Sequence, residues 1–128
     1  MREETRNWIS KADKDLGTAG FALNSVDGPL PVTTAMHCQL SAEKYLKAYL
    51  CEHDVAFSSQ QALTSLLEDC IAADESFEAL RSDINELDGY SIASRYPSAD
   101  DSLVFTKEAV ATLERVKEFV LSRLRAEK

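Results

Sequence analysis

The stretch "HCQLSAEKYLKAYL", residues 37–50, holds the side chains of this chain that are best suited to chemistry. It places one histidine, one glutamine, one glutamate and two lysines in an otherwise apolar run. An imidazole can transfer a proton near neutral pH, and lysine ammonium groups bind phosphate. Whether these groups share a site depends on which side of one predicted helix each of them occupies.

On a helical wheel of 100° per residue the side chains of this helix separate into three groups. The core face is apolar and holds Ala35, Cys38, Ala42, Tyr45, Leu46 and Tyr49. The opposite side holds His37, Ser41, Lys44 and Ala48. A mixed stripe of Met36, Leu40, Glu43 and Lys47 lies between them. Because a stripe of apolar and charged residues suits an interface better than bare solvent, Met36 and Leu40 are predicted to contact a second subunit or a partner protein.

Two interpretations of the polar residues remain open. Glu43 and Lys47 are spaced as a solvated i, i+4 ion pair, which would contribute only a few tenths of a kcal/mol. Alternatively, the cluster of Gln39, Glu43, Lys44 and Lys47 binds a small anion. His37 is either a surface or capping residue or a general base, and a base needs a partner that its sequence neighbours do not offer.

A second informative stretch is "GYSIASRYPSADDS", residues 89–102. Pro97 disfavours helical geometry at Tyr96, so the chain turns just after Arg95. A guanidinium held at such a bend can bind a phosphate or carboxylate with two hydrogen bonds. The alternative is an ion pair with Asp100, Asp101 or Glu86. The predicted ligand-binding set is therefore Gln39, Glu43, Lys44, Lys47, Arg95 and Tyr96, with Tyr96 offering a stacking surface.

The remaining pattern is helical. Apolar residues recur at three- and four-residue steps over 3–24, from 33 or 34 to 51, from 58 or 59 to 71, over 75–88, and from about 100–102 to the charged end. The proline loop at 28–31 and the bend at 94–97 separate these segments. No stretch alternates apolar and polar residues for long enough to predict a strand. We therefore expect one all-α domain over residues 1–128, an up-and-down four-helix bundle with an additional shorter helix. Gly17 and Gly20 weaken the first helix, and we expect a closely packed neighbouring helix to compensate.

Composition limits the function. With 14 basic and 22 acidic residues the net charge is −8, which disfavours broad, non-specific binding to nucleic acid. The three cysteines form no CxxC pair, and neither they nor the two histidines have the spacing of a zinc site, so we predict buried free thiols and no metal. The sequence shows no secretory signal and no run of about 20 apolar residues, so we expect a cytoplasmic protein without a membrane association. No P-loop, GxGxxG, GxSxG or HExxH motif is present.

Taken together, three motifs resemble the HEPN domain family (higher eukaryotes and prokaryotes nucleotide-binding). They are Trp8 with Ala12, Asp15 and Leu16, then "HCQLSAEKYLKAYL", then the Arg-Tyr-Pro of "SRYP" at 94–97. The resemblance implies a bundle of four or five helices that is frequently a homodimer. It also implies binding of a nucleotide or RNA, and a minimal nucleotidyltransferase as the partner in a toxin–antitoxin type pair.

Many members of this family are metal-independent endoribonucleases that use an arginine followed, after four to six residues, by a histidine. No arginine of this chain has a histidine at that spacing, since the only histidines are His37 and His53. Near the start of the third helix, Gln60 or Gln61 stands where the family often has a histidine, and glutamine cannot act as a general base. The sequence therefore predicts a non-catalytic, dimeric nucleotide- or RNA-binding module with no cofactor. The alternatives are a divergent endoribonuclease that uses His37 with Arg95, and a purely structural adaptor for protein interactions.

Overall fold

A computed structural model describes residues 1–26, 30–93 and 103–126. The described chain forms α1 (Glu3–Leu23), α2 (Pro31–Glu52), α3 (Leu63–Ala73), a 3₁₀ helix η1 (Glu75–Leu80), α4 (Arg81–Ala93) and α5 (Leu103–Ala126). These residues contain no strand. The predicted all-α bundle, with four long helical segments and the shorter α3, is confirmed.

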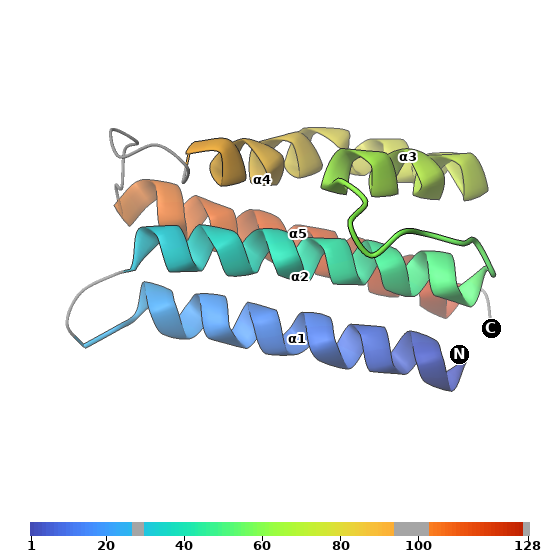
Figure 1. Cartoon of the computed structure of the whole chain (residues 1–128), viewed down its shortest axis with the longest axis horizontal. Helices are drawn as coiled ribbons and strands as arrows, with labels where there is room; N and C mark the ends of the chain where they lie inside the picture. Colours follow the sequence, from blue (N-terminus) through green and yellow to red (C-terminus); the bar gives the residue numbers. More distant parts are fainter. Residues whose placement is uncertain (27–29, 94–102, 127–128) are drawn as a thin grey trace.

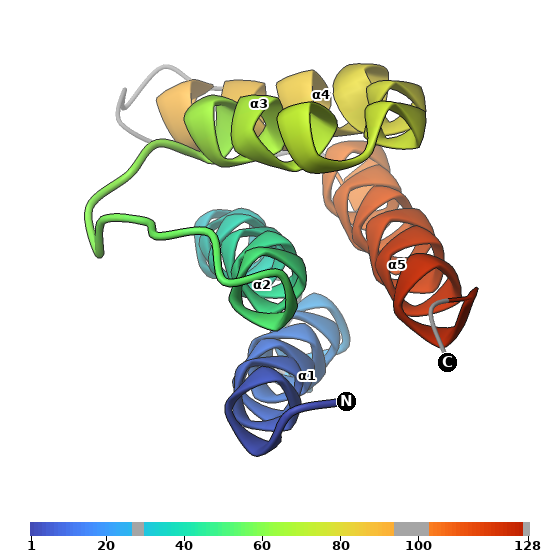
Figure 2. The ribbon, with the colours of Figure 1, turned by 90° about the vertical axis from the view of Figure 1, so that its right-hand side faces the viewer.

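Helix α2 is central in the bundle. Figure 2 shows α1 on one side of α2 and the layer formed by α3, η1 and α4 on the other, with α5 alongside. Successive long helices run in opposite directions, and the 53–62 connection returns along α2 before α3 begins (Figure 1). As a result, α2 contacts α1, α3, α4 and α5, and most of its residues from Ser41 to Cys51 are buried.

The core lies where α2, the α3–η1–α4 layer and α5 meet. An aromatic cluster joins the three, because the Phe77 ring of η1 lies 4.4 Å from Tyr49 of α2 and 5.1 Å from Phe119 of α5, between ring centroids. Fully buried aliphatic side chains surround this cluster: Leu46, Leu50, Leu63, Leu66, Leu67, Ile84, Leu87, Leu113 and Val116. Of the predicted core face of α2, every member is buried.

The structure corrects three helix boundaries. Helix α2 begins at Pro31 and not at a threonine cap, because proline needs no hydrogen bond at the first helical position. Thr34 instead lies inside α2 and donates its hydroxyl to the Leu30 carbonyl at 2.9 Å. Helix α3 begins at Leu63, since Ser58 and Gln61 form a local turn in which the Ser58 N–H donates to the Gln61 amide oxygen at 3.2 Å. Helix α4 continues to Ala93 through Gly89, which the sequence had placed just beyond its end.

The end of α2 is closed by a Schellman motif without glycine. Asp54 has a φ of 57°, in the left-handed region, while the Val55 N–H donates to the Leu50 carbonyl at 2.9 Å and the Asp54 N–H to the Cys51 carbonyl at 3.2 Å. Arg2 secures this turn by an ion pair with Asp54 and by a 2.7 Å hydrogen bond to the Cys51 carbonyl. The start of α1 is thereby attached to the end of α2.

Two further expectations have clear outcomes. The thiols of Cys38, Cys51 and Cys70 are free and buried, as predicted, and burial raises the pKa of Cys38 to about 12. The expected close packing at Gly17 and Gly20 is wrong: a Cβ added to either would meet no atom within 4 Å. Among the described residues, no helix combines the length and the apolarity that a membrane crossing requires.

Candidate functional site

The polar side of α2 faces α1, and this decides the environment of its charged residues. The wheel placed His37, Ser41, Lys44 and Ala48 opposite the core, where a lone helix would meet solvent. In the folded chain Ser41 and Ala48 are fully buried, and the Ser41 hydroxyl donates to the Ala12 carbonyl of α1 at 2.8 Å. The α1–α2 contact is thus a second, more polar packing surface of the same helix.

Asp15 of α1 joins two of the predicted residues. Its Oδ1 lies 3.0 Å from the His37 Nδ1, and its Oδ2 forms an ion pair with the Lys44 ammonium. The side chains are partly accessible, with exposed fractions of 13% for Asp15, 25% for His37 and 27% for Lys44. A carboxylate that contacts the Nδ1 of an imidazole orients the ring and leaves its Nε2 for another partner. Since α2 starts at Pro31, His37 lies in its second turn and does not cap the helix.

A second polar contact lies beside the first. The buried Tyr45 donates its hydroxyl to Asp13, whose carboxylate also pairs with Lys117 of α5 at 3.1 Å. Burial, followed by the bond to Asp13, raises the pKa of Tyr45 above its usual range, so it remains a neutral hydrogen-bond donor. Asp13 thereby links α1, α2 and α5, and it positions α1 for the contact that Asp15 makes.

Glu43 connects the remaining polar residues of α2. It accepts a hydrogen bond from Gln39, and it lies within electrostatic range of Lys47, Lys44 and Asp15. Burial raises the pKa of the Glu43 carboxyl, and the attraction of Lys47 opposes that effect. The predicted cluster of Gln39, Glu43, Lys44 and Lys47 is therefore a physical neighbourhood, which we call the α2 polar cluster.

Lys47 is not the solvated half of an ion pair, because it is only 6% exposed. Its ammonium lies 5.4 Å from the ring centroid of Trp8 and 5.7 Å from that of Phe57. The two rings meet edge to face, with centroids 5.6 Å apart. Cation–π attraction compensates for part of the lost hydration of this ammonium. Lys44 and Lys47 are thus in different surroundings, one beside a carboxylate and one between aromatic rings.

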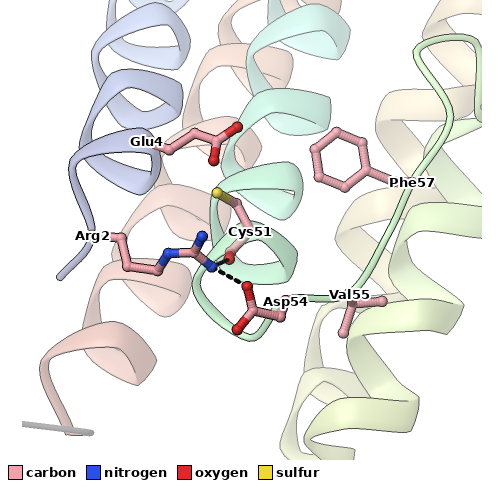
Figure 3. A pocket seen from close by; sticks show the side chains of 6 residues that line it. All are labelled: Arg2, Glu4, Cys51, Asp54, Val55 and Phe57. Atoms are coloured by element: carbon pink, nitrogen blue, oxygen red, sulfur yellow. Dashed lines mark hydrogen bonds and ion pairs between the residues drawn. The ribbon is translucent and has the colours of Figure 1, made fainter.

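Two small pockets flank this aromatic pair. One, of about 170 Å³, is lined by Glu4, Asn7, Trp8 and Lys11 on α1. The other, also about 170 Å³, is lined by Arg2, Glu4, Cys51, Asp54, Val55 and Phe57. In Figure 3 the Arg2 guanidinium lies beside the Cys51 carbonyl and Asp54, to both of which it is bonded. The Glu4 carboxylate lies above the Cys51 side chain, and the Phe57 ring lies to the right of both. The arginine therefore already has its partners, and Glu4 borders both pockets.

Arg95 and Tyr96 lie outside the described residues, so their approach to the α2 polar cluster stays a prediction. The described helices on either side of them, α4 and α5, do have a clear position relative to α2. Helix α4 ends and α5 begins at the same end of the bundle as the start of α2 (Figure 1). His37 is near that end, whereas Lys47 lies ten residues and hence about 15 Å further along α2. Of these two residues of α2, His37 is therefore the closer to the end of α4 and the start of α5.

Met36 and Leu40, the predicted interface residues, differ in exposure. Met36 is 47% exposed, and Val32, one turn earlier, is 45% exposed. Leu40 is half-buried. The exposed apolar side chains of the predicted interface therefore lie on the first two turns of α2.

Sequence reasoning missed the role of Asp15 as the shared partner of His37 and Lys44, and it missed Phe57 entirely. Asp15 and Trp8 recur seven residues apart on one side of α1, which was an available signal that both face α2. Phe57 belongs to an irregular connection, where no periodicity predicts the direction of a side chain. Among the described residues, no group of three or more His, Cys, Asp and Glu side chains is arranged to hold a metal ion.

Comparison with known proteins identifies the family of this chain. The HEPN domain matches residues 5–124, which span α1 to the last turn of α5. No curated protein and no solved structure matches the chain. Because the match covers nearly the whole chain and every helix of the bundle, this protein belongs to the HEPN domain family.

Proposed function

We propose that this HEPN protein is a non-catalytic module that binds a nucleotide or an RNA end, acts as a homodimer, and serves as the accessory partner of a minimal nucleotidyltransferase in a toxin–antitoxin type system. The observation that carries the binding role is the α2 polar cluster, in which Lys44 is held beside Asp15 and His37 with a quarter of its side chain exposed. The Arg-Tyr-Pro branch of the family and the nucleotidyltransferase partner rest on the sequence resemblance.

The distribution of charge favours the α1–α2 side for an anionic ligand. Residues 63–93, which form α3, η1 and α4, contain eight acidic residues and one basic residue, a net charge of −7 out of −8 for the whole chain. An anion is repelled from that layer. The helices α1, α2 and α5 are nearly neutral overall, so a few cations among them can attract a small phosphate-bearing ligand within a Debye length.

Binding should be measured by calorimetry with the four nucleoside monophosphates and a short RNA. We expect Lys44→Ala to weaken the affinity about tenfold, because it removes a charge-assisted contact worth about 1.5 kcal/mol. Lys44→Arg should restore most of the binding, because it keeps the positive charge. The control is Lys14→Ala, which removes an exposed lysine on α1 and should have no effect on the affinity. A thermal melt of each variant shows that it is folded. If no ligand gives heat up to millimolar concentrations, the binding role is wrong.

The contact between Asp15 and His37 favours one enzymatic alternative, a divergent metal-independent endoribonuclease with His37 as its base. In such an enzyme Asp15 would orient the imidazole. The same preparations incubated with RNA should show no cleavage. Cleavage by the unmodified protein that disappears in both His37→Ala and Arg95→Ala would replace the non-catalytic role by this one. Dimer formation without any nucleotide binding would instead support the structural adaptor.

The dimer proposal rests on a stretch of the chain with few charges. From Leu16 to Met36 the sequence has one charged residue, Asp27. Large apolar side chains are exposed in this part of the chain: Phe21 (83%), Val26 (103%), Leu30 (48%), Val32 (45%) and Met36 (47%). A second copy carries the same charge of −8 and is repelled over most of the surface, so this apolar stretch with few charges is where two copies can meet.

Light scattering tests this interface. We expect the protein to have the mass of a dimer, and Met36→Asp to convert it to a monomer, since two like charges would face each other across the symmetry axis. Ser10→Asp, an equally charged change at an exposed position on α1, should leave the dimer intact. A dimeric mass that survives Met36→Asp and Leu40→Asp would place the interface elsewhere.

A further inference from the structure

Trp8 is the only tryptophan of the chain, and it forms one wall of the pocket with Glu4, Asn7 and Lys11. The pocket is small, with a volume of about 170 Å³, and it is open to solvent. A flat ring can lie in it while the groups attached to that ring remain outside. None of these four residues belongs to the α2 polar cluster.

The indole ring is held in place before any ligand arrives. The edge-to-face contact with Phe57 and the buried ammonium of Lys47 fix it from the side of α2. A side chain that is already ordered loses little entropy when a ligand stacks on it. Trp8 is also only partly buried, so ring surface remains accessible from the pocket.

Lys11 occupies the accessible side of this ring in the free protein. Its ammonium lies 5.4 Å from the Trp8 centroid, and the residue is exposed. An exposed cation–π contact is weaker than the stacking of a nucleobase on an aromatic ring. A base can therefore displace the ammonium from the ring, and the displaced ammonium is then available to neutralise the phosphate of the same ligand.

The polar groups around the ring restrict the ligand further. The two ammonium groups disfavour a cationic ligand and favour one with a negative charge. The Glu4 carboxylate lies beside the Cys51 thiol, between the two pockets (Figure 3). It accepts hydrogen bonds only, and it binds best where two N–H donors stand side by side. The Asn7 amide can both donate and accept. Among the common bases guanine alone offers two adjacent donors, N1–H and the N2 amino group, next to an acceptor at O6.

We propose that Glu4, Asn7, Trp8 and Lys11 form a base-binding subsite that is selective for guanine, an inference that rests on the proposed nucleotide-binding function. Trp8 and Asp15 lie seven residues apart on one side of α1, a separation of about 10 Å. Lys44 pairs with Asp15, so this separation is within the reach of a nucleotide whose base stacks on Trp8 and whose phosphate contacts Lys44. The subsite supplies the base specificity, and the α2 polar cluster supplies the phosphate contact.

Intrinsic fluorescence tests the subsite directly, since all tryptophan emission comes from Trp8. We expect GMP to quench this emission saturably and to bind about tenfold more tightly than AMP, CMP or UMP. Glu4→Gln should weaken the binding of GMP about tenfold and remove most of that preference. Glu3→Gln, an equivalent change at the neighbouring exposed position outside the pocket, is the matched control and should behave as the unmodified protein.

The outcomes separate the subsite from the function on which it rests. Heat of nucleotide binding in calorimetry without any quenching of Trp8 would overturn the subsite and leave the proposed function standing. Equal quenching by all four nucleotides, or an unchanged affinity for GMP in Glu4→Gln, would overturn the guanine assignment. Neither heat nor quenching with any nucleotide would overturn both proposals.

Discussion

Replacing Phe77 with alanine should lower the free energy of unfolding by about 3–5 kcal/mol, the largest effect that we expect from any single substitution. Phe77 is fully buried, and its ring contacts Tyr49 of α2 and Phe119 of α5 from the 3₁₀ helix η1. The substitution removes the aromatic surface that joins the α3–η1–α4 layer to the rest of the bundle. It also leaves a cavity, because three separate elements would have to move to fill the space.

Urea unfolding followed by far-UV circular dichroism measures this change. Glu75→Ala is the control, since Glu75 is exposed on the same 3₁₀ helix and its removal should alter the stability by no more than about 0.5 kcal/mol. Because domains of this size are stable by about 5–15 kcal/mol, Phe77→Ala can leave a substantial unfolded fraction. A loss below about 1 kcal/mol would mean that the aromatic cluster does not hold the two layers together.

The second large effect is expected at Asp15. Asp15→Ala should lower the stability by about 2–3 kcal/mol, because it leaves Lys44 and His37 without the carboxylate that they share. Breaking a fully buried pair costs about 3–5 kcal/mol, and partial exposure of all three side chains reduces that value here. The same variant should bind nucleotides at least as tightly as the unmodified protein, since the carboxylate that competes for Lys44 is gone.

The loss of stability and the gain in affinity that we expect for Asp15→Ala have opposite signs. Together they distinguish a residue that positions Lys44 from a residue that contacts the ligand. Glu78→Ala is the control: its carboxylate pairs with Arg81 at exposed positions in the other layer of the bundle, so its loss should cost less than about 1 kcal/mol and leave nucleotide binding unchanged. Stability is read from urea unfolding and affinity from calorimetry. If Asp15→Ala abolishes nucleotide binding although the variant is folded, the carboxylate itself contacts the ligand, and our assignment of Lys44 as the phosphate contact is wrong.

Much of the architecture follows from the sequence alone. The 3.6-residue period of Trp8, Ala12, Leu16 and Ala19 predicted α1 to within a residue of its observed end, because burial of one apolar stripe is a local property of the chain. The boundaries that failed were those at which side chains compete with the backbone or at which proline starts a helix, as at Ser58 and Pro31. Gly89 did not end α4. A glycine ends a helix where it adopts the left-handed conformation, whereas α4 stays helical through Gly89 to Ala93.

For the candidate site, the sequence determined which residues share a side of α2, and the tertiary structure decided what covers each side. A helical wheel separates the core face of α2 from its polar residues, because spacing fixes the angle of each side chain around the helix axis, but it places Lys44 on a different side from Glu43 and Lys47. It cannot show that Asp15 meets Lys44 and His37, or that Trp8 and Phe57 enclose Lys47. Those contacts join residues that are about 10 to 40 positions apart in the chain, and they exist only because α1 and the 53–62 connection pack against α2. Spacing along a helix is set locally, whereas the partner of a charged group is set by packing between elements that are distant in sequence.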